Sequence, residues 1–427
     1  MAARRSQVTN GSVYRKTELR NGLRIVTETL PAVRSVALGV WVDVGSRNET
    51  PAENGLSHFV EHMLFKGSTH RTAKELASEL ENLGGSLNGF TSREQTCYYA
   101  RVLDEHLPIA VEVLADLTCN PTLTATHVNR EKQVVCEEIK EALDNPSDKI
   151  HDVFSQTFWG KHPLGQPIMG SQANIQSLTR PRVVDFVKRH YRCGSIVIAA
   201  CGSVDHDRIV RMVKKYFHFG EGAVVPAPKA EPPRTHKTNI EKNDSKQTHL
   251  CFGFPALPYE SSERMVMLAL SSYLGGGMSS VLFQKIREDR GLAYSVYSFN
   301  DFYRDTGIFG IYLGTDSKHL RKAVEVVMAE VRLLKKKRLT STQLGQLKSQ
   351  MKGHLILSQE STNSRMNRLA RQELLIGSYQ PLTDMVVDIE KVSTKRIQDL
   401  ANQVLDESCA VAAVLGPVSK GALDGAF

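Results

Sequence analysis

The chain has 427 residues, which exceeds the usual size of one domain, so we expect at least two hydrophobic cores. Hydrophobic residues make up 41% and charged residues 23%, as in water-soluble globular proteins, and no run approaches the roughly 18 to 20 apolar residues that span a bilayer. The formal charge of +8 comes from basic residues dispersed among 46 acidic ones, so we expect neither a nucleic-acid partner nor membrane insertion.

The start of the chain and its cysteines bear on the compartment. Residues 1–20 carry five basic residues but lack the apolar run of a secretory signal, which leaves a short transit peptide as an alternative. The seven cysteines form no CxxC pair and are interpreted as free thiols. We therefore expect a cytoplasmic protein, with the mitochondrial matrix or another reducing compartment as the alternative.

Apolar residues alternate with others from Val36 to Val44, which predicts a strand with one strongly buried face. Further elements of the first half are expected in this order: a helix over 55–64, a strand over 97–102, helices over 107–117 and 124–143, and an apolar closing strand over 196–200. Proline and glycine then accumulate from 217 to 233, a composition typical of a linker.

The second half repeats this plan, with a strand over 249–254, a helix over 263–274 and a closing strand over 410–415. From Val36 to His249 is 213 positions and from Gly202 to Gly416 is 214, which indicates an internal duplication. Because strands and helices mix without strict βαβ alternation, the fold class is predicted as α+β. The expected domains are residues 1–218 and 237–427, joined by a linker at 219–236.

The strongest local signal is the run His58-Phe59-Val60-Glu61-His62 within the expected helix. At about 100° per residue, His62 lies about 40° from His58 around the helix axis and Glu61 about 60° on the other side, so the three side chains share one arc. Two such imidazoles can bind one metal ion beside a carboxylate, and this order of residues is known as an inverted zinc-peptidase motif. Histidines in helices are also common as structural or surface residues.

Catalytic zinc is held by three protein ligands that leave one position for water, so a third ligand must come from elsewhere. The helix expected over 124–143 supplies glutamates at 131, 137, 138 and 141. Glu131 and Glu138 are seven residues apart and therefore lie about 20° apart on one helical face. One of these two can bind the metal while the other orients a ligand.

The region around the motif resembles the signature of the insulinase/pitrilysin family of metallopeptidases, and specifically its shorter branch that contains the processing peptidases. The matching residues are 55–67, Gly-Leu-Ser-His-Phe-Val-Glu-His-Met-Leu-Phe-Lys-Gly. The resemblance extends from Leu19 to the closing strand. It places the third zinc ligand about 76 residues after the second histidine, at Glu138, and makes Glu131 the accompanying acidic residue.

The resemblance also implies a substrate-binding strand. The run Asn88-Gly89-Phe90-Thr91 is similar to the family's strand that pairs with the substrate backbone, although Gly89 stands where alanine is more usual. From the residues alone, the glycines at 84–85 are equally consistent with a simple hairpin turn.

Arg287 and Tyr294 resemble the family's Arg and Tyr pair, seven residues apart, which reaches the zinc site and the scissile group. The residues alone favour a surface arginine and a sheet tyrosine, and the functional interpretation rests on the resemblance. They follow a glycine-rich segment at 275–280 that lacks the lysine of a phosphate-binding loop. This segment is interpreted as a helix break, with Ser279 or Ser280 capping a new helix.

The duplication does not repeat the metal motif. Adding the offset of 213 to positions 58, 61 and 62 leads to Ser271, Leu274 and Gly275. We therefore expect residues 1–218 to form the catalytic zinc-binding domain and residues 237–427 to contribute to substrate binding and to an interface.

Together these patterns predict a zinc-dependent metalloendopeptidase with one Zn²⁺ per chain, in which His58, His62 and Glu138 bind the metal and Glu61 is the catalytic base. The expected substrates are extended or unfolded peptides. The resemblance implies four similar domains around the substrate, and this chain has two, so we expect a homodimer whose Arg and Tyr pair serves the partner's site.

Two other functions are alternatives to a peptidase. The family resembled also includes inactive scaffold and partner subunits, but those lose motif residues and here the motif is intact. A further group of enzymes with the same metal motif acts on small thioether-linked sugars, but its members are much shorter.

Overall fold

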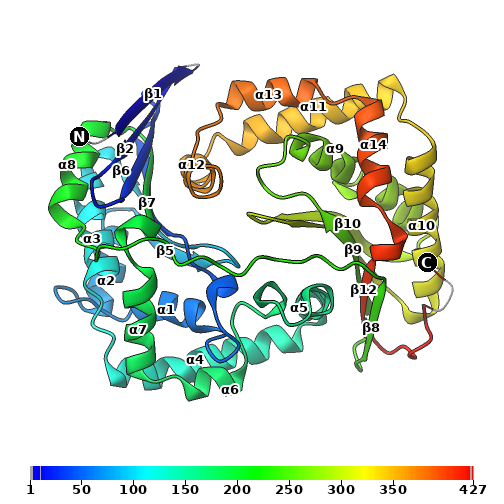
Figure 1. The fold of residues 1–427 in the computed structure, drawn as a ribbon, viewed down its shortest axis with the longest axis horizontal. Helices are drawn as coiled ribbons and strands as arrows, with labels where there is room; N and C mark the ends of the chain where they lie inside the picture. The colour runs from blue at the N-terminus through cyan, green and yellow to red at the C-terminus, as the bar shows by residue number, and fades with distance from the viewer. Residues whose placement is uncertain (1–2, 10, 424–425, 427) are drawn as a thin grey trace. The chain divides into compact units, whose positions relative to one another are not determined.

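The computed structural model describes residues 3–9, 11–423 and 426. It confirms the α+β architecture and divides the chain into two compact units, each built on one mixed β-sheet (Figure 1). The first unit comprises Met1–Ile139, Gln166–Pro228 and Leu357–Pro381. The second comprises Lys140–Gly165, Lys229–Ile356 and Leu382–Phe427.

The first unit contains a seven-stranded sheet. Its strands are, in spatial order, β1 (Ala3–Thr9), β2 (Ser12–Glu18), β3 (Arg24–Thr29), β7 (Ile196–Gly202), β4 (Ser35–Val42), β6 (Thr96–Leu103) and β5 (Ser86–Thr91). β3 pairs in parallel with β7, and the other neighbours are antiparallel. The β5 strand therefore lies at one edge of the sheet.

Helices cover one face of this sheet with apolar side chains. They include α1 (Leu56–Leu64), α2 (Ala73–Glu81), α3 (Leu107–Cys119), α6 (Gln172–Ser177), α7 (Arg180–His190), α8 (His206–Tyr216) and the first part of α4 (Ala125–Asp144). Leu38 and Val40 of β4 share one buried core with Phe59 of α1 and Val111 of α3. The metal motif is thus carried by a helix that is fixed on the sheet by its apolar side.

The second unit repeats the first. Its sheet has the order β10 (Ala293–Phe302), β11 (Gly307–Thr315), β9 (Thr248–Ala256), β12 (Val411–Gly416) and β8 (Lys237–Lys242), which matches β5-β6-β4-β7-β3. β8 pairs in parallel with β12, as β3 does with β7. Its helices are α5 (Pro146–Trp159), α9 (Arg264–Gly275), α10 (Leu320–Lys336), α11 (Ser341–Ser358), α13 (Leu382–Glu390) and α14 (Thr394–Val404). The matching strand order supports the internal duplication.

The second face of each sheet is covered by a helix from the other half of the sequence. Helix α12 (Thr362–Leu375) packs on β7, β4 and β3, and α5 packs on β12, β9 and β8. In the first unit, Met366 of α12 lies against Trp41 of β4, whose indole nitrogen is 3.1 Å from the Met366 sulfur. The strongly buried face expected for β4 is present, and α12 buries the other face as well, which carries Trp41 and Ala37.

This exchange also sets the limits of the compact units. They differ from the domains expected at 1–218 and 237–427 in two segments. Residues 140–165 belong to the second unit, and residues 357–381 belong to the first. The main division, between Pro228 and Lys229, falls inside the expected linker at 219–236.

A buried charge cluster fixes α12 on the first sheet. Glu28 of β3 is 1% exposed, and its carboxylate accepts hydrogen bonds from Arg365 at 2.8 Å and from Arg368 at 3.1 Å. The Tyr379 hydroxyl donates to the same carboxylate at 3.4 Å. Because a buried carboxylate is costly unless it is paired, these bonds define the position of α12 on the sheet.

The cysteines and the helices bear on two expectations from the composition. All seven cysteines are free thiols, five of them buried and two partly exposed. Within residues 3–9, 11–423 and 426, no helix is long and apolar enough to cross a membrane.

The charge cluster leads to a stability prediction. Glu28→Ala should lower the free energy of unfolding by about 3–5 kcal/mol, because it leaves buried guanidinium groups without their partner. Urea denaturation would measure the change. Asp399→Ala is the control, since it removes an exposed ion pair with Lys395 on α14 and should leave the midpoint nearly unchanged. A Glu28→Ala midpoint as high as that of the control would contradict the structural role.

Candidate metal centre

Helix α1 presents the motif through its own pattern of burial. Its apolar residues face the core, whereas His58, Glu61 and His62 lie on the partly exposed side. The helix begins after Gly55, which has a φ of 97° and packs so closely that a Cβ atom would lie 2.5 Å from the Met169 oxygen. Only glycine suits both conditions, so this residue fixes where the helix starts.

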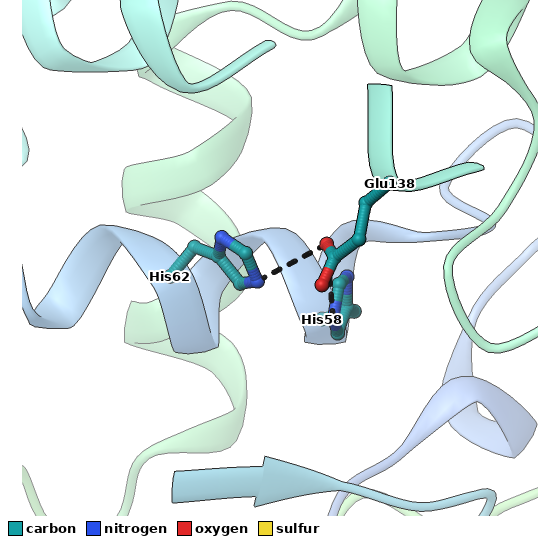
Figure 2. Close-up of side chains that lie close together, drawn as sticks. All are labelled: His58, His62 and Glu138. Atoms are coloured by element: carbon teal, nitrogen blue, oxygen red, sulfur yellow. Dashed lines mark ion pairs between the residues drawn. The ribbon is translucent and has the colours of Figure 1, made fainter. Parts of the chain in front are cut away.

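Helix α4 brings Glu138 to the two histidines. Nε2 of His58 lies 3.9 Å and Nε2 of His62 lies 3.5 Å from Oε2 of Glu138. Figure 2 shows both imidazoles rising from α1 and the carboxylate pointing between them. Their three ligand atoms lie within 4.8 Å of one another, and no other such group of His, Cys, Asp or Glu occurs in the part of the chain that the structure describes.

The residues around this point fit a zinc ion. Two ligands that each lie about 2.1 Å from zinc at the tetrahedral angle are about 3.4 Å apart, close to the separations found here. Oε2 of Glu138 is covered from solvent and has no hydrogen-bond partner, a state that a cation would relieve. Two histidines and one carboxylate also form a ligand set of catalytic zinc with an open fourth position.

The two histidines are held differently. Nδ1 of His62 donates to Oε1 of Glu131 at 2.9 Å, because an ionised carboxylate can only accept. This bond turns the Nε2 lone pair of His62 toward Glu138. Nδ1 of His58 is buried and has no hydrogen-bond partner. Burial and the neighbouring charge of His62 lower the pKa of His58 to about 4, so this imidazole is neutral near pH 7.

The carboxylate of Glu131 is itself supported by a cation. Its side chain is almost fully buried, and Nζ of Lys66 lies 2.9 Å from Oε2. Burial raises the pKa of Glu131, but hydrogen bonds from His62 and Lys66 lower it by more, so the pKa lies below its ordinary value. For His62, burial lowers the pKa, whereas Glu131 and the carboxylate of Glu138 raise it above its ordinary value. The structure thus places Glu131 behind His62 and Glu138 in front of it.

Glu61 lies beside the histidines on α1. The hydroxyl of Thr91, on β5, donates to Oε2 of Glu61 at 2.6 Å. Burial raises the pKa of Glu61, and the nearby charge of Glu138 adds to this, although the Thr91 bond and His62 oppose it. A carboxylate with a raised pKa is a better proton acceptor near neutral pH.

The run from Asn88 to Thr91 belongs to the edge strand β5, which pairs only with β6 in the sheet. Gly89 faces α1, and a Cβ atom there would lie 3.1 Å from the ring of Phe65 and 3.2 Å from the Cys97 oxygen. This tight approach gives a physical reason for glycine where the resembled family more usually has alanine. The glycines at 84–85 join the end of α2 to β5, so the strand is present and these glycines form no hairpin turn.

Arg287 and Tyr294 lie together in the second unit. The Arg287 guanidinium is 4.9 Å from the centre of the Tyr294 ring, which is 70% exposed. Arg287 belongs to a short π-helix, η5 (Phe283–Glu288), whose wider winding replaces the expected helix, and no serine side chain caps it. The pairing of β10 with β11 shifts between Ala293 and Ser295, so Tyr294 stands at a β-bulge. Such irregularities often redirect side chains at functional sites.

The second unit has no counterpart of the metal site among its described residues. At the position equivalent to His62, a Cβ atom on Gly275 would lie 2.3 Å from the backbone nitrogen of Ser298. Strand β10 therefore packs directly on the backbone of α9, and no side chain fits there.

Three supporting residues were not identified as such from the sequence. Lys66 stands four residues after His62, a spacing that indicates proximity on or near a helix. Thr91 was expected only as part of the substrate strand. Glu49, whose carboxylate accepts the backbone N–H groups of Gly55 and Ser57, lies outside α1 and has no local pattern that announces it.

The contact between Glu131 and His62 leads to a prediction on metal affinity. Glu131→Gln should raise the zinc dissociation constant by about 10- to 100-fold, because the amide lacks the charge that holds the His62 proton on Nδ1. Competition with a chelator would measure the constant. Glu141→Gln, exposed on the same helix, is the matched control and should bind zinc as the wild type does. Equal constants for the two variants would exclude this role of Glu131.

Comparisons with known proteins identify the family of the chain. The family model described as insulinase (peptidase family M16) matches residues 24–172, and the model of the peptidase M16 inactive domain matches residues 177–351. The match to the inactive-domain model includes part of the second half of the sequence, which lacks the metal group among its described residues.

Similar proteins of known sequence are called zinc proteases. The chain is 42% identical to the uncharacterized zinc protease YmxG of Bacillus subtilis over 396 residues, or 92% of this chain and 96% of that protein. It is 38% identical to an uncharacterized zinc protease of Streptomyces coelicolor, over 95% of this chain and 90% of that protein.

Solved structures share the fold. A protease from Helicobacter pylori matches with a TM-score of 0.88 at 24% identity, over 95% of this chain and 99% of that chain. A peptidase M16 inactive domain from Pseudomonas fluorescens also matches with a TM-score of 0.88, at 19% identity, over 95% of this chain and 98% of that chain. From the family models and the sequence relatives together, this chain belongs to the insulinase family of peptidases, M16.

Proposed function

We propose that the protein is a zinc-dependent metalloendopeptidase that hydrolyses extended or unfolded peptides. The observation that carries this proposal is the convergence of two Nε2 atoms and one unpartnered carboxylate oxygen beside Glu61. His58, His62 and Glu138 are the proposed ligands of one Zn²⁺ per chain. Glu131 is proposed to orient His62 without touching the metal.

Zinc bound by these ligands would polarise the scissile carbonyl and increase the acidity of water. Glu61 takes a proton from the attacking water as the new carbon–oxygen bond forms, and it donates this proton to the amine as the carbon–nitrogen bond breaks. The hydrogen bond from Thr91 holds the Glu61 carboxylate in place during both transfers. The raised pKa of Glu61 suits a group that must accept and then release a proton near neutral pH.

The position of β5 supports an extended substrate. Asn88 to Thr91 lie on an edge strand, and an added peptide strand can form backbone hydrogen bonds with such an edge. Thr91 of the same strand contacts Glu61, so a peptide paired with β5 would pass the proposed catalytic base. Backbone pairing reads little of the sequence, which favours unfolded segments over folded proteins as substrates.

The proposed working unit is a homodimer. A peptidase of this type is expected to need four similar domains around its substrate, and this chain supplies two. A symmetric pair is the commonest way for identical chains to supply the others. In that arrangement Arg287 and Tyr294 of one chain would donate hydrogen bonds to the substrate carbonyl at the partner's zinc site.

The zinc proposal makes a direct prediction. The purified protein should contain one zinc per chain, and chelation should abolish peptide hydrolysis. Glu61→Gln should keep the metal and lose nearly all turnover, because the amide cannot accept a proton. His58→Ala should lose the activity and most of its affinity for zinc, because one of the three proposed ligands is removed. Elemental analysis and a peptide digest would measure these outcomes, and a Glu61→Gln variant with a tenth of wild-type activity would show that another group is the base. An inactive wild type that binds zinc would favour the scaffold alternative.

The dimer proposal is tested by mixing two inactive variants. One carries Arg287→Ala with Tyr294→Ala, and the other carries Glu61→Gln. Random exchange makes roughly half of the dimers mixed, each with one intact site of two, so the mixture should recover about a quarter of wild-type activity. A mixture of Glu61→Gln with His58→Ala is the control, since both changes lie in the zinc half and no intact site can form. If the first mixture also stayed inactive despite proven exchange, the sharing of sites would be wrong.

A further inference from the structure

A buried carboxylate closes the N-terminal end of the helix that carries the metal motif. The side chain of Glu49 is 2% exposed. Its Oε1 accepts a hydrogen bond from the Ser57 backbone nitrogen at 2.5 Å, and its Oε2 accepts from the Gly55 nitrogen at 2.8 Å and from the Asn54 side chain at 3.3 Å. Glu49 thus binds α1 from a segment outside the helix.

This carboxylate substitutes for a cap that α1 lacks. The residue before the helix is Gly55, which has no side chain to accept from the first N–H groups. The N-terminal end of a helix also attracts negative charge. No ion pair joins Glu49 to a cation among the described residues, and burial raises its pKa to about 7 despite the hydrogen bonds that lower it. The helix end is therefore its main partner.

The first turn of α1 matters for one of the two histidines in particular. His62 is oriented through Nδ1 by Glu131, whereas Nδ1 of His58 has no partner. The direction of His58 toward Glu138 consequently depends on the backbone that carries it and on the packing around its ring. That backbone directly follows Ser57, the residue whose N–H makes the shortest bond to Glu49.

We propose that Glu49 is a positioning residue of the metal centre, which fixes the first turn of α1 and thereby places His58 for metal binding. This inference rests on the proposed zinc site. Glu131 orients His62 through a hydrogen bond to its imidazole. Glu49 orients His58 through hydrogen bonds to the backbone of the first turn. Outer carboxylates of this kind change metal affinity when they are replaced.

A substitution of Glu49 also removes a buried hydrogen-bonded group, so a loss of stability alone would not test the proposal. Glu49→Gln is the main variant, because it keeps the size of the side chain but presents an amide N–H₂ where a backbone N–H needs an acceptor. Glu28→Gln is the matched control. It changes another almost fully buried carboxylate of the same unit, in the cluster that binds α12.

The experiment measures the zinc dissociation constant by competition with a chelator, on the full chain. Glu49→Gln is expected to raise this constant by about 10- to 100-fold, whereas Glu28→Gln should leave it unchanged at a comparable loss of thermal stability. The visible absorption spectrum of the cobalt-substituted protein should change in Glu49→Gln and not in Glu28→Gln. Glu49→Asp keeps the charge but shortens the side chain, and it should give an intermediate constant. If Glu49→Gln does not fold, the zinc dissociation constant of Glu49→Asp is compared with that of Glu28→Gln instead.

A double-mutant comparison identifies the histidine through which Glu49 acts. In a His58→Ala background, Glu49→Gln should weaken the residual zinc binding further by less than about threefold, because the ligand it positions is gone. In a His62→Ala background it should keep its full effect. Equal effects in both backgrounds would overturn the role through His58.

Two further outcomes separate this inference from the function on which it rests. If the wild type bound zinc and Glu49→Gln bound it as tightly, the positioning role would be wrong while the proposed peptidase site stood. If the wild type bound no zinc at all, the proposed function and this inference would both be wrong.

Discussion

Both faces of each sheet must be removed from water, and this constraint governs the rest of the structure. The central strands β4 and β7 are apolar on both faces, and exposed apolar surface costs roughly 25 cal/mol per Å². Helices of the same half cover one face, and α12 or α5, from the opposite half, covers the other. Neither half of the sequence therefore contains all of its own core.

The same packing orders the residues of the candidate metal centre. Three contacts tie α1 to other segments: His62 contacts Glu131 of α4, Glu61 contacts Thr91 of β5, and the first turn contacts Glu49. Because these segments are anchored in one core, their side chains hold the ligands without large adjustment. A metal ion that bound there would meet side chains that are already in place.

The sequence predicted what local patterns determine. Helical spacing placed His58, Glu61 and His62 in one arc, and alternation found most strands. Helical spacing did not decide which of Glu131 and Glu138 binds the metal, since only about 20° separates them on one helix face. The packing distinguishes them, because Glu131 is buried behind His62 and an oxygen of Glu138 faces both Nε2 atoms. The exchanged helices and the contact of Glu49 with α1 depend on residues far apart in sequence or outside the helix, for which periodicity carries no signal.

The two units share one fold but differ at the position of the metal motif. In the first unit, α1 presents two imidazoles to the glutamates of α4 and the Glu61 carboxylate to Thr91 of β5. In the second, Ser298 of β10 approaches Gly275 so closely that no side chain fits there, and Ser271, at the position equivalent to His58, bonds to Ser298 instead. The second unit also contains two backbone irregularities. Arg287 belongs to a π-helix, and Tyr294 stands at a β-bulge. One copy thus carries the candidate metal group, and the other carries the exposed Arg287 and Tyr294 pair at irregular backbone.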